Sequence, residues 1–182
     1  MTANQQDSNW NLTVALTGAS GAVFGRELLA ALDADPRVAQ VNFVPSESSL
    51  RVLAEELQLS GRHQLIEKLL GHASPKIAQL NESDIGAGIA NGLARNLVER
   101  AADVTLKERR PLLLCVRETP FNKIHLRNMT LAADAGAVIF PVMPSFYNLP
   151  VDSTEMATQF AYRVLAHIGL PQPGAYVWKG DE

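Results

Sequence analysis

The sequence has little cysteine, few aromatic residues and no excess of charge of either sign. Among its 182 residues are one cysteine, 6% aromatic residues, and 16 basic against 19 acidic residues, for a formal net charge of -3. One cysteine excludes a disulfide framework and a cysteine-based zinc or iron–sulfur site. With balanced charge, the sequence has no excess of basic residues that would indicate binding to nucleic acid or to an acidic membrane surface. The four histidines show no metal-ligand spacing, so we expect no metal.

Long apolar runs are also missing, and polar segments flank a single predicted domain. No run approaches the roughly 20 residues that a membrane span requires. Residues 1–11 are polar and lack the basic start and apolar stretch of a signal peptide. We therefore expect a cytoplasmic protein with a disordered leader over residues 1–11, a folded domain over 12–170 and a tail over 171–182.

Strand and helix patterns alternate along this domain. Apolar, β-rich runs predict strands at 12–17, 41–44, 112–116 and 137–140. Helical periodicity predicts five helices. The first has Leu28, Leu29 and Leu32 on one face, and the second has Leu50, Leu53, Ala54 and Leu57 on one face. The other three cover residues 63–70, 123–135 and 153–167. Gly136 is placed to cap the fourth of these helices, and Ser153 is placed as the N-cap of the last. This order predicts an α/β fold with a parallel sheet covered on both faces, whose ligands lie beyond the carboxyl ends of the strands.

One interval departs from that alternation. Between Ser46 and Pro111 no convincing strand pattern occurs, although a sheet of this kind normally gains one there. The interval instead reads as helix throughout, and its second half has Ile85, Ile89, Leu93 and Leu97 at four-residue spacing.

The first candidate site is the turn after the first strand, Thr17-Gly18-Ala19-Ser20-Gly21. A glycine turn at a helix N-terminus directs backbone N–H groups at a phosphate, and Ser20 adds a hydroxyl donor. A purely structural turn is equally compatible with the pattern. Ser46, which ends the second strand, is either a helix cap or a ligand contact, and caps are the more common of the two.

Charged residues at later strand ends form a second candidate site. Arg117 and Glu118 follow a buried strand pattern, so Arg117 is suited to hold an anion and Glu118 to move a proton, although a surface ion pair is the alternative. Tyr147 ends the next strand, and Arg163 interrupts an apolar helix face. By itself Lys107 reads as a solvated helix end, Cys115 as a small core residue, and Trp178 as a docking anchor or a cover over a ligand.

Several segments together resemble the UbiX flavin prenyltransferases. They are the turn 17–21, Arg100-Ala101-Ala102-Asp103-Val104-Thr105-Leu106-Lys107-Glu108-Arg109-Arg110, Leu114-Cys115-Val116-Arg117-Glu118-Thr119-Pro120, Gly136-Ala137-Val138-Ile139 and Pro144-Ser145-Phe146-Tyr147. They occur in the same order as in that family, and the resemblance extends from about Leu12 to Leu170.

This resemblance implies a flavodoxin-like Rossmann fold and a metal-free reaction that joins the dimethylallyl group of dimethylallyl phosphate to N5 and C6 of reduced FMN. The product would be the prenylated FMN used by UbiD-type decarboxylases. The resemblance assigns FMN binding to Gly18, Ala19, Ser20, Ser46 and Arg117, and catalytic roles to Glu118 and Ser20. It assigns dimethylallyl phosphate binding to Lys107, Arg117, Glu118, Tyr147, Arg163 and Trp178. It also implies a large homo-oligomer, a dodecamer, whose sites are completed by neighbouring chains.

The sequence departs from this family at one place. Members carry a central strand, a flavin-binding loop and the start of a helix, whereas here the segment 83–90 is joined directly to 91–97. Roughly one βα unit, a little under 30 residues, is therefore predicted to be missing near Ala90-Asn91. The sheet must then close the gap or expose an edge, and the flavin pocket loses one wall.

Three hypotheses follow from this departure. The first is a working flavin prenyltransferase in which other residues or a neighbouring subunit replace the missing loop. The second is a non-catalytic paralogue with impaired flavin binding that serves as an oligomeric scaffold or binding protein. The third is a flavin-dependent decarboxylase of the wider superfamily, which the Arg117-Glu118 pair and Tyr147 disfavour. We favour the first.

Overall fold

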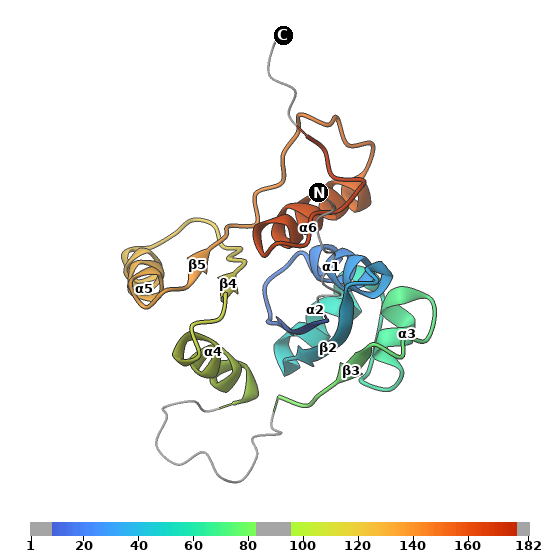
Figure 1. The fold of residues 1–182 in the computed structure, drawn as a ribbon, viewed down its shortest axis with the longest axis horizontal. Helices are drawn as coiled ribbons and strands as arrows, with labels where there is room; N and C mark the ends of the chain where they lie inside the picture. Colours follow the sequence, from blue (N-terminus) through green and yellow to red (C-terminus); the bar gives the residue numbers. More distant parts are fainter. Residues whose placement is uncertain (1–8, 83–95, 178–182) are drawn as a thin grey trace, which may run out of the picture.

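The computed structural model describes residues 9–82 and 96–177. In chain order its elements are β1 (Trp10–Leu16), α1 (Ala22–Ala34), β2 (Val38–Pro45), α2 (Glu47–Leu57), α3 (Leu65–Leu70), β3 (Ile77–Gln79), α4 (Leu97–Lys107), β4 (Leu113–Leu114), α5 (Lys123–Asp134), β5 (Val138–Ile139) and α6 (Ser153–His167). This is the predicted α/β architecture (Figure 1).

The strands form two separate parallel sheets. One has the order β1-β2-β3 and the other pairs β4 with β5. The N–H of Trp10 donates to the Arg37 carbonyl, and the Leu16 carbonyl accepts from the Ser46 N–H, so these alternate residues of β1 face β2. The intervening residues, 11, 13 and 15, direct their backbone groups to an edge with no strand partner in the described part of the chain. Within the described residues, the sheet thus has an unpaired edge at β1, where the sequence predicts a missing strand.

Most of the core lies in the β1-β2-β3 half of the molecule. Phe43 of β2 is fully buried with Leu29 and Leu32 of α1 and Leu53 of α2, and α6 adds Leu165. Phe160 of α6 links this half to the other sheet. Its ring lies 5.2 Å from that of Phe24 on α1 and 5.7 Å from that of Phe140 after β5. Helix α6 therefore connects the two sheets through aromatic packing.

Several predicted elements differ in the structure. The interval predicted to be helical throughout contains β3, a strand of three residues that is too short to give a pattern and is fixed by pairing with β2. Helix α3 begins at Leu65 instead of 63, because Gln64 has a positive φ of 52°. Asp152, not Ser153, caps α6 by accepting from the Glu155 N–H at 2.8 Å. Strand β1 begins at Trp10, ahead of the predicted domain start.

The second sheet is shorter and more exposed than predicted. Strands β4 and β5 have two residues each, and neither is fully buried. Cys115, predicted to be a core residue, is exposed. The reason is that β4 pairs with β5 alone in the described part of the chain, so its other edge is uncovered. The helical spacing over 85–93, the junction at Ala90-Asn91 and residues 1–8 lie outside the described residues.

A buried carboxylate fastens the end of α1 to the chain beyond α6. Asp35 is 4% exposed and accepts two hydrogen bonds from the Arg37 guanidinium, at 2.6 and 2.9 Å. The Gln172 amide donates to the same carboxylate at 2.8 Å. The bonds from Arg37, with a smaller contribution from Gln172, outweigh burial and hold the pKa of Asp35 well below its usual range.

We expect Asp35→Asn to lower the free energy of unfolding by about 1–3 kcal/mol at pH 7. Because the folded-state pKa is lowered, the stabilisation by Asp35 is present above the unfolded pKa of about 3.9 and is lost as the pH falls below it. Urea unfolding between pH 7 and 2.5 measures both effects, with Asp134→Asn as the control for a solvent-exposed aspartate. An equal loss of stability on acidification in wild type and Asp35→Asn would contradict the assignment.

Within the described residues no helix is long and apolar enough to cross a membrane, and no three His, Cys, Asp or Glu side chains are placed to hold a metal ion.

Candidate functional site

The glycine turn between β1 and α1 comes within contact of the start of α2. A Cβ on Gly18 would lie 2.5 Å from Ser48 Cβ, so only glycine allows this approach. Gly21 caps α1 with a φ of 102°, a conformation that glycine adopts without strain. In the described part of the chain, the N–H groups of Gly18, Ala19 and Ser20 donate to no other group. They are therefore available to a ligand with acceptor oxygens.

Two serine hydroxyls lie at the same turn. Ser46 is 5% exposed and caps α2, accepting from the Ser49 N–H at 3.1 Å. Its Oγ lies 3.0 Å from Ser48 Oγ, and the Ser48 side chain contacts the Gly18 position. The structure confirms that Ser46 is a helix cap and brings its hydroxyl into the Gly18 region, where it stays a predicted ligand contact.

Glu56 is a residue of this site that the sequence analysis missed. Its carboxylate accepts from the Gly21 N–H at 2.9 and 3.0 Å and from the Ala22 N–H at 2.8 Å. Burial alone would raise the pKa of Glu56, but hydrogen bonds from Ser20, Ala22 and Gly21 and the charge of Arg117 lower it. The N-terminus of α1 thus holds an anion in this structure, as its dipole favours. No local pattern marks Glu56, because it lies on a different helix from the turn.

Arg117 lies beside the turn, as predicted for a cation at a strand end. Its Cδ is 3.2 Å from the position that a Cβ on Gly21 would occupy, and its charge acts on Glu56. Glu118 follows Arg117 and is exposed, and its Oε1 accepts from the Thr119 N–H at 2.9 Å. The structure therefore gathers Gly18, Ser20, Ser46 and Arg117 in one place, with Glu118 at its border.

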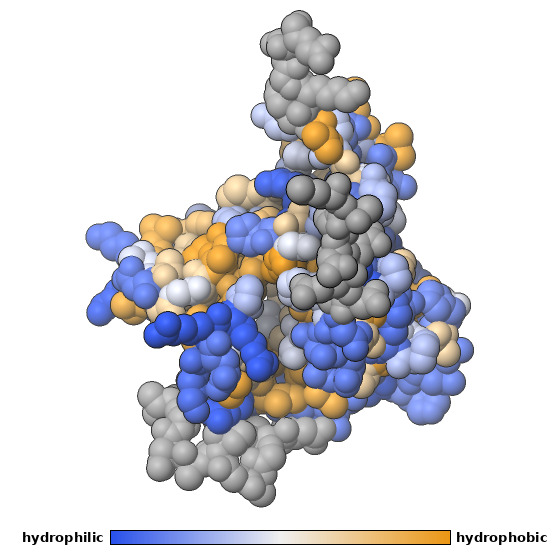
Figure 2. Space-filling model, in the orientation of Figure 1, coloured by the Kyte–Doolittle hydropathy of each residue, from blue (hydrophilic) through white to orange (hydrophobic). Residues whose placement is uncertain are grey.

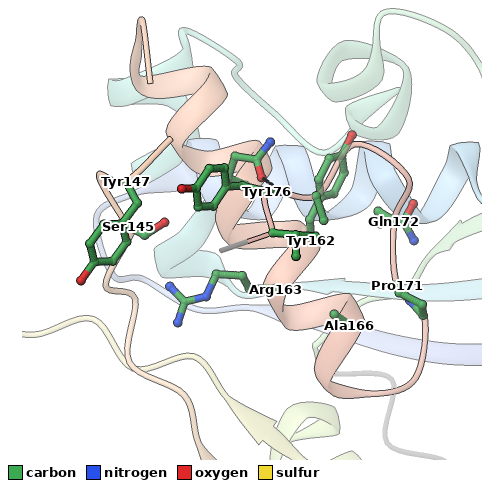
Figure 3. Close-up of a pocket in the computed structure, with 11 residues that line it drawn as sticks. Ser145, Tyr147, Tyr162, Arg163, Ala166, Pro171, Gln172 and Tyr176 are labelled. Carbon is green, nitrogen blue, oxygen red and sulfur yellow. Dashed lines mark hydrogen bonds between the residues drawn. The ribbon is translucent and has the colours of Figure 1, made fainter. Parts of the chain in front are cut away.

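Tyr147 and Arg163 belong to a second place, a pocket of about 550 Å³ against α6. Ser145 and Tyr147 line it from the segment after β5, and Tyr162, Arg163 and Ala166 line it from α6 (Figure 3). The Arg163 guanidinium is exposed and lies 3.4 Å from the Met143 carbonyl, so this cation on the apolar helix has the route to water that it requires. The pocket offers one guanidinium among phenol rings, which suits an anion attached to a small apolar group.

The two remaining predicted residues are Lys107 and Trp178. Lys107 is the last residue of α4, is exposed, and does not line the pocket. In Figure 1 helix α4 lies below β4, whereas helix α6 lies to the upper right of β4. Trp178 lies outside the described residues, directly after Val177 of the pocket lining.

Comparison with known proteins assigns this chain to a family. A family model described as Flavoprotein matches residues 1–160. The flavin prenyltransferase UbiX of Pseudomonas aeruginosa is 36% identical over 190 aligned positions, covering 88% of this chain and 90% of the relative. The UbiX of Escherichia coli K12 is 37% identical over 186 positions, covering 93% and 98%. Both alignments are longer than this chain's 182 residues, so both relatives carry residues without a counterpart here.

Solved structures agree with these relatives. A dodecameric FMN-dependent UbiX-like decarboxylase from Escherichia coli O157:H7 superposes with a TM-score of 0.78 at 32% identity, covering 94% of this chain and all of the other. AnUbiX (PadA1), solved with FMN and dimethylallyl pyrophosphate, gives a TM-score of 0.78 at 30% identity, covering 96% of this chain and all of the other. The chain therefore belongs to the UbiX flavin prenyltransferase family.

Proposed function

We propose that this chain joins the dimethylallyl group of dimethylallyl phosphate to N5 and C6 of reduced FMN, and passes the prenylated flavin to a UbiD-type decarboxylase in the cytoplasm. The observation that carries the proposal is the glycine turn, with three uncommitted N–H groups beside Arg117 and two serine hydroxyls. Relatives named flavin prenyltransferases and a neighbour solved with FMN and dimethylallyl pyrophosphate support it.

The residues at the turn fit the polar parts of FMN. The N–H groups of Gly18, Ala19 and Ser20, the Ser46 hydroxyl and the Arg117 guanidinium would hold its oxygen atoms. Reduced FMN supplies the nucleophilic N5 and C6 atoms. The allylic C–O bond breaks with its electron pair on the phosphate, bonds form to N5 and C6, and these two atoms lose one proton each. One proton goes to the internal alkene carbon, and the other leaves with the phosphate.

Glu56 would orient the Ser20 hydroxyl at the turn. The carboxylate accepts from this hydroxyl and from two backbone N–H groups, so the Ser20 proton points toward Glu56 and an oxygen lone pair faces the ligand side. The lowered pKa keeps Glu56 ionised at neutral pH. Ser20 is then placed to accept a hydrogen bond from the flavin through that lone pair.

The phosphate substrate would occupy the pocket at α6. Arg163 would hold the phosphate, Tyr147 would donate to it, and the apolar dimethylallyl group would lie against the phenol rings. Glu118 would protonate the departing phosphate. Lys107 and Trp178 would complete the site, in accord with the family pattern.

Neighbouring copies of the chain would bring Lys107 and Glu118 to the pocket. Large apolar side chains on α5 and after β5 are more than half exposed, among them Ile124, Leu131, Met143, Phe146, Leu149 and Val151. Figure 2 shows apolar surface over this half of the molecule. Contiguous exposed apolar surface of this kind marks a contact with another protein. A dodecameric neighbour supports a homo-oligomer, in which these residues would be covered.

Enlarging Gly18 is predicted to weaken FMN binding about tenfold or more. In Gly18→Ala the new Cβ would lie 2.5 Å from Ser48 Cβ, so the turn and α2 must move apart and the three N–H groups shift. Ser48→Gly removes the obstructing side chain, so the double variant Gly18→Ala/Ser48→Gly should recover most of the affinity. Fluorescence titration with FMN measures the affinities of the single and the double variant. Equal affinities for wild type and Gly18→Ala would place the flavin elsewhere.

The proposed function is tested by FMN titration of the purified chain, followed by absorbance between about 350 and 500 nm. We expect saturable binding and a new spectrum after reduction and addition of dimethylallyl phosphate. A chain that stays colourless at high FMN concentration would contradict the proposal and favour the non-catalytic paralogue.

A further inference from the structure

The chain beyond α6 lines the α6 pocket and is fastened at two points. We call residues 171–177 the C-terminal strap. At its start the Arg37 guanidinium donates to the Pro171 carbonyl at 2.9 Å, and the Gln172 amide donates to the buried Asp35 carboxylate at 2.8 Å. This first anchor ties the strap to the end of α1 and the start of β2.

The second anchor is Gln159, a half-buried residue of α6 that also lines the pocket. Its Nε2 donates to the Gly174 carbonyl at 3.0 Å, and its Oε1 accepts from the Tyr176 N–H at 2.8 Å. One amide thus satisfies a backbone acceptor and a backbone donor two residues apart. A glutamate keeps the reach and the acceptor but loses the donor to Gly174, and an asparagine is too short to span both groups.

At the second anchor the strap lies directly on the pocket lining. A Cβ on Gly174 would be 3.2 Å from Cε2 of Tyr162, so the backbone rests against that ring. Tyr176 then lines the same pocket as Tyr147 and Arg163 (Figure 3). Tyr176 is 44% exposed and has no other backbone hydrogen bond that holds it in the described part of the chain. The position of this pocket wall therefore depends on Gln159.

We propose that Gln159 is a positioning residue that sets the size of the substrate pocket, by holding Tyr176 as the wall that encloses the apolar group next to Arg163. The inference rests on the proposed function, because the ligand is a small allylic phosphate. When Gln159 holds Tyr176 in place, the pocket favours a dimethylallyl group over a longer geranyl chain. Releasing the wall weakens contact with the short group and removes the obstacle to the long one.

The test compares wild type with Gln159→Ala, Gln159→Glu and Gln159→Asn, and with Gln40→Ala as a matched change on an exposed β2 residue outside the pocket. Steady-state prenyl transfer is measured with dimethylallyl phosphate and geranyl phosphate. In Gln159→Ala we expect KM for dimethylallyl phosphate to rise about tenfold with kcat retained. The ratio of kcat/KM for dimethylallyl phosphate to kcat/KM for geranyl phosphate should fall by a similar factor. Gln159→Glu should lie between wild type and Gln159→Ala, and Gln159→Asn close to Gln159→Ala.

Hydrogen exchange at the Tyr176 amide supplies an independent readout of the strap. Loss of its acceptor should speed exchange there roughly 3- to 10-fold in Gln159→Ala and leave it unchanged in Gln40→Ala. Faster exchange with unchanged KM and unchanged substrate preference would overturn the proposal, as would unchanged exchange. If wild type itself transfers neither group, the proposed function fails, and the inference that rests on it fails with it.

Discussion

Glu118→Gln is expected to lower kcat for prenyl transfer by about 100- to 10,000-fold while leaving FMN affinity close to that of wild type. Glutamine keeps the acceptor oxygen that Glu118 offers to the Thr119 N–H at 2.9 Å, so the local backbone should be preserved. It removes the proton that the departing phosphate would receive. Rapid-quench measurement of prenylated flavin separates this chemical step from substrate binding.

A matched control for Glu118→Gln is Glu108→Gln, an exposed carboxylate just after α4. We expect that change to leave kcat within about twofold, since an exposed charge outside the site does not take part in proton transfer. Unchanged turnover in Glu118→Gln would remove Glu118 from the reaction. A loss of FMN affinity equal to the loss of kcat would assign it a binding role.

Phe160→Ala is expected to lower the free energy of unfolding by about 3–5 kcal/mol. Phe160 is 4% exposed, and its ring packs against Phe24 on one side and Phe140 on the other. In the described residues the two sheets share no strand pairing, so this aromatic contact carries much of the connection between them. Urea unfolding followed by circular dichroism measures the change.

The unfolding curve of Phe160→Ala should also become broader than that of wild type, because the β4-β5 half loses its attachment to the better-packed half. Phe121→Ala provides the comparison, since the Phe121 ring lies 6.4 Å from His125 and is only partly buried. Phe121→Ala should lower the free energy of unfolding by at most about 1 kcal/mol. Equal costs for the two variants would show that α6 does not couple the sheets.

Elements with long apolar periodicity could be predicted from the sequence, and they are the ones that form the core. Leu29 and Leu32 of α1 and Leu53 of α2 are buried as their spacing predicts. The glycine turn and Arg117 also lie together, in accord with the expectation that ligands lie beyond the carboxyl ends of parallel strands. These features follow from local pattern and from one topological rule.

Features that depend on tertiary pairing could not be predicted. Strand β3 is three residues long and owes its conformation to the free edge of β2. Glu56 reaches the glycine turn from another helix, and Gln159 reaches the strap across fifteen residues of sequence. A polar residue on a helix surface carries no local signal of such a partner. The roles of the predicted ligand contacts stay predictions.

The predicted loss of a βα unit left two alternatives open: the first strand pairs with the strand from Leu112, or the sheet exposes an edge. Within the described residues, β1 and β4 each have one edge without a strand partner. The exposure of Cys115 follows from this opening. The glycine turn, Glu56 and Arg117 nevertheless lie together on one side of it, which is why a working enzyme is the favoured hypothesis.

The most direct measurement is the mass of the flavin recovered after anaerobic incubation of the purified chain with reduced FMN and dimethylallyl phosphate. We predict FMN enlarged by one five-carbon prenyl unit, together with one phosphate released per flavin consumed, and neither product in Glu118→Gln over the same time. Recovery of FMN of unchanged mass, with dimethylallyl phosphate intact and with FMN bound to the chain, would contradict prenyl transfer by this protein.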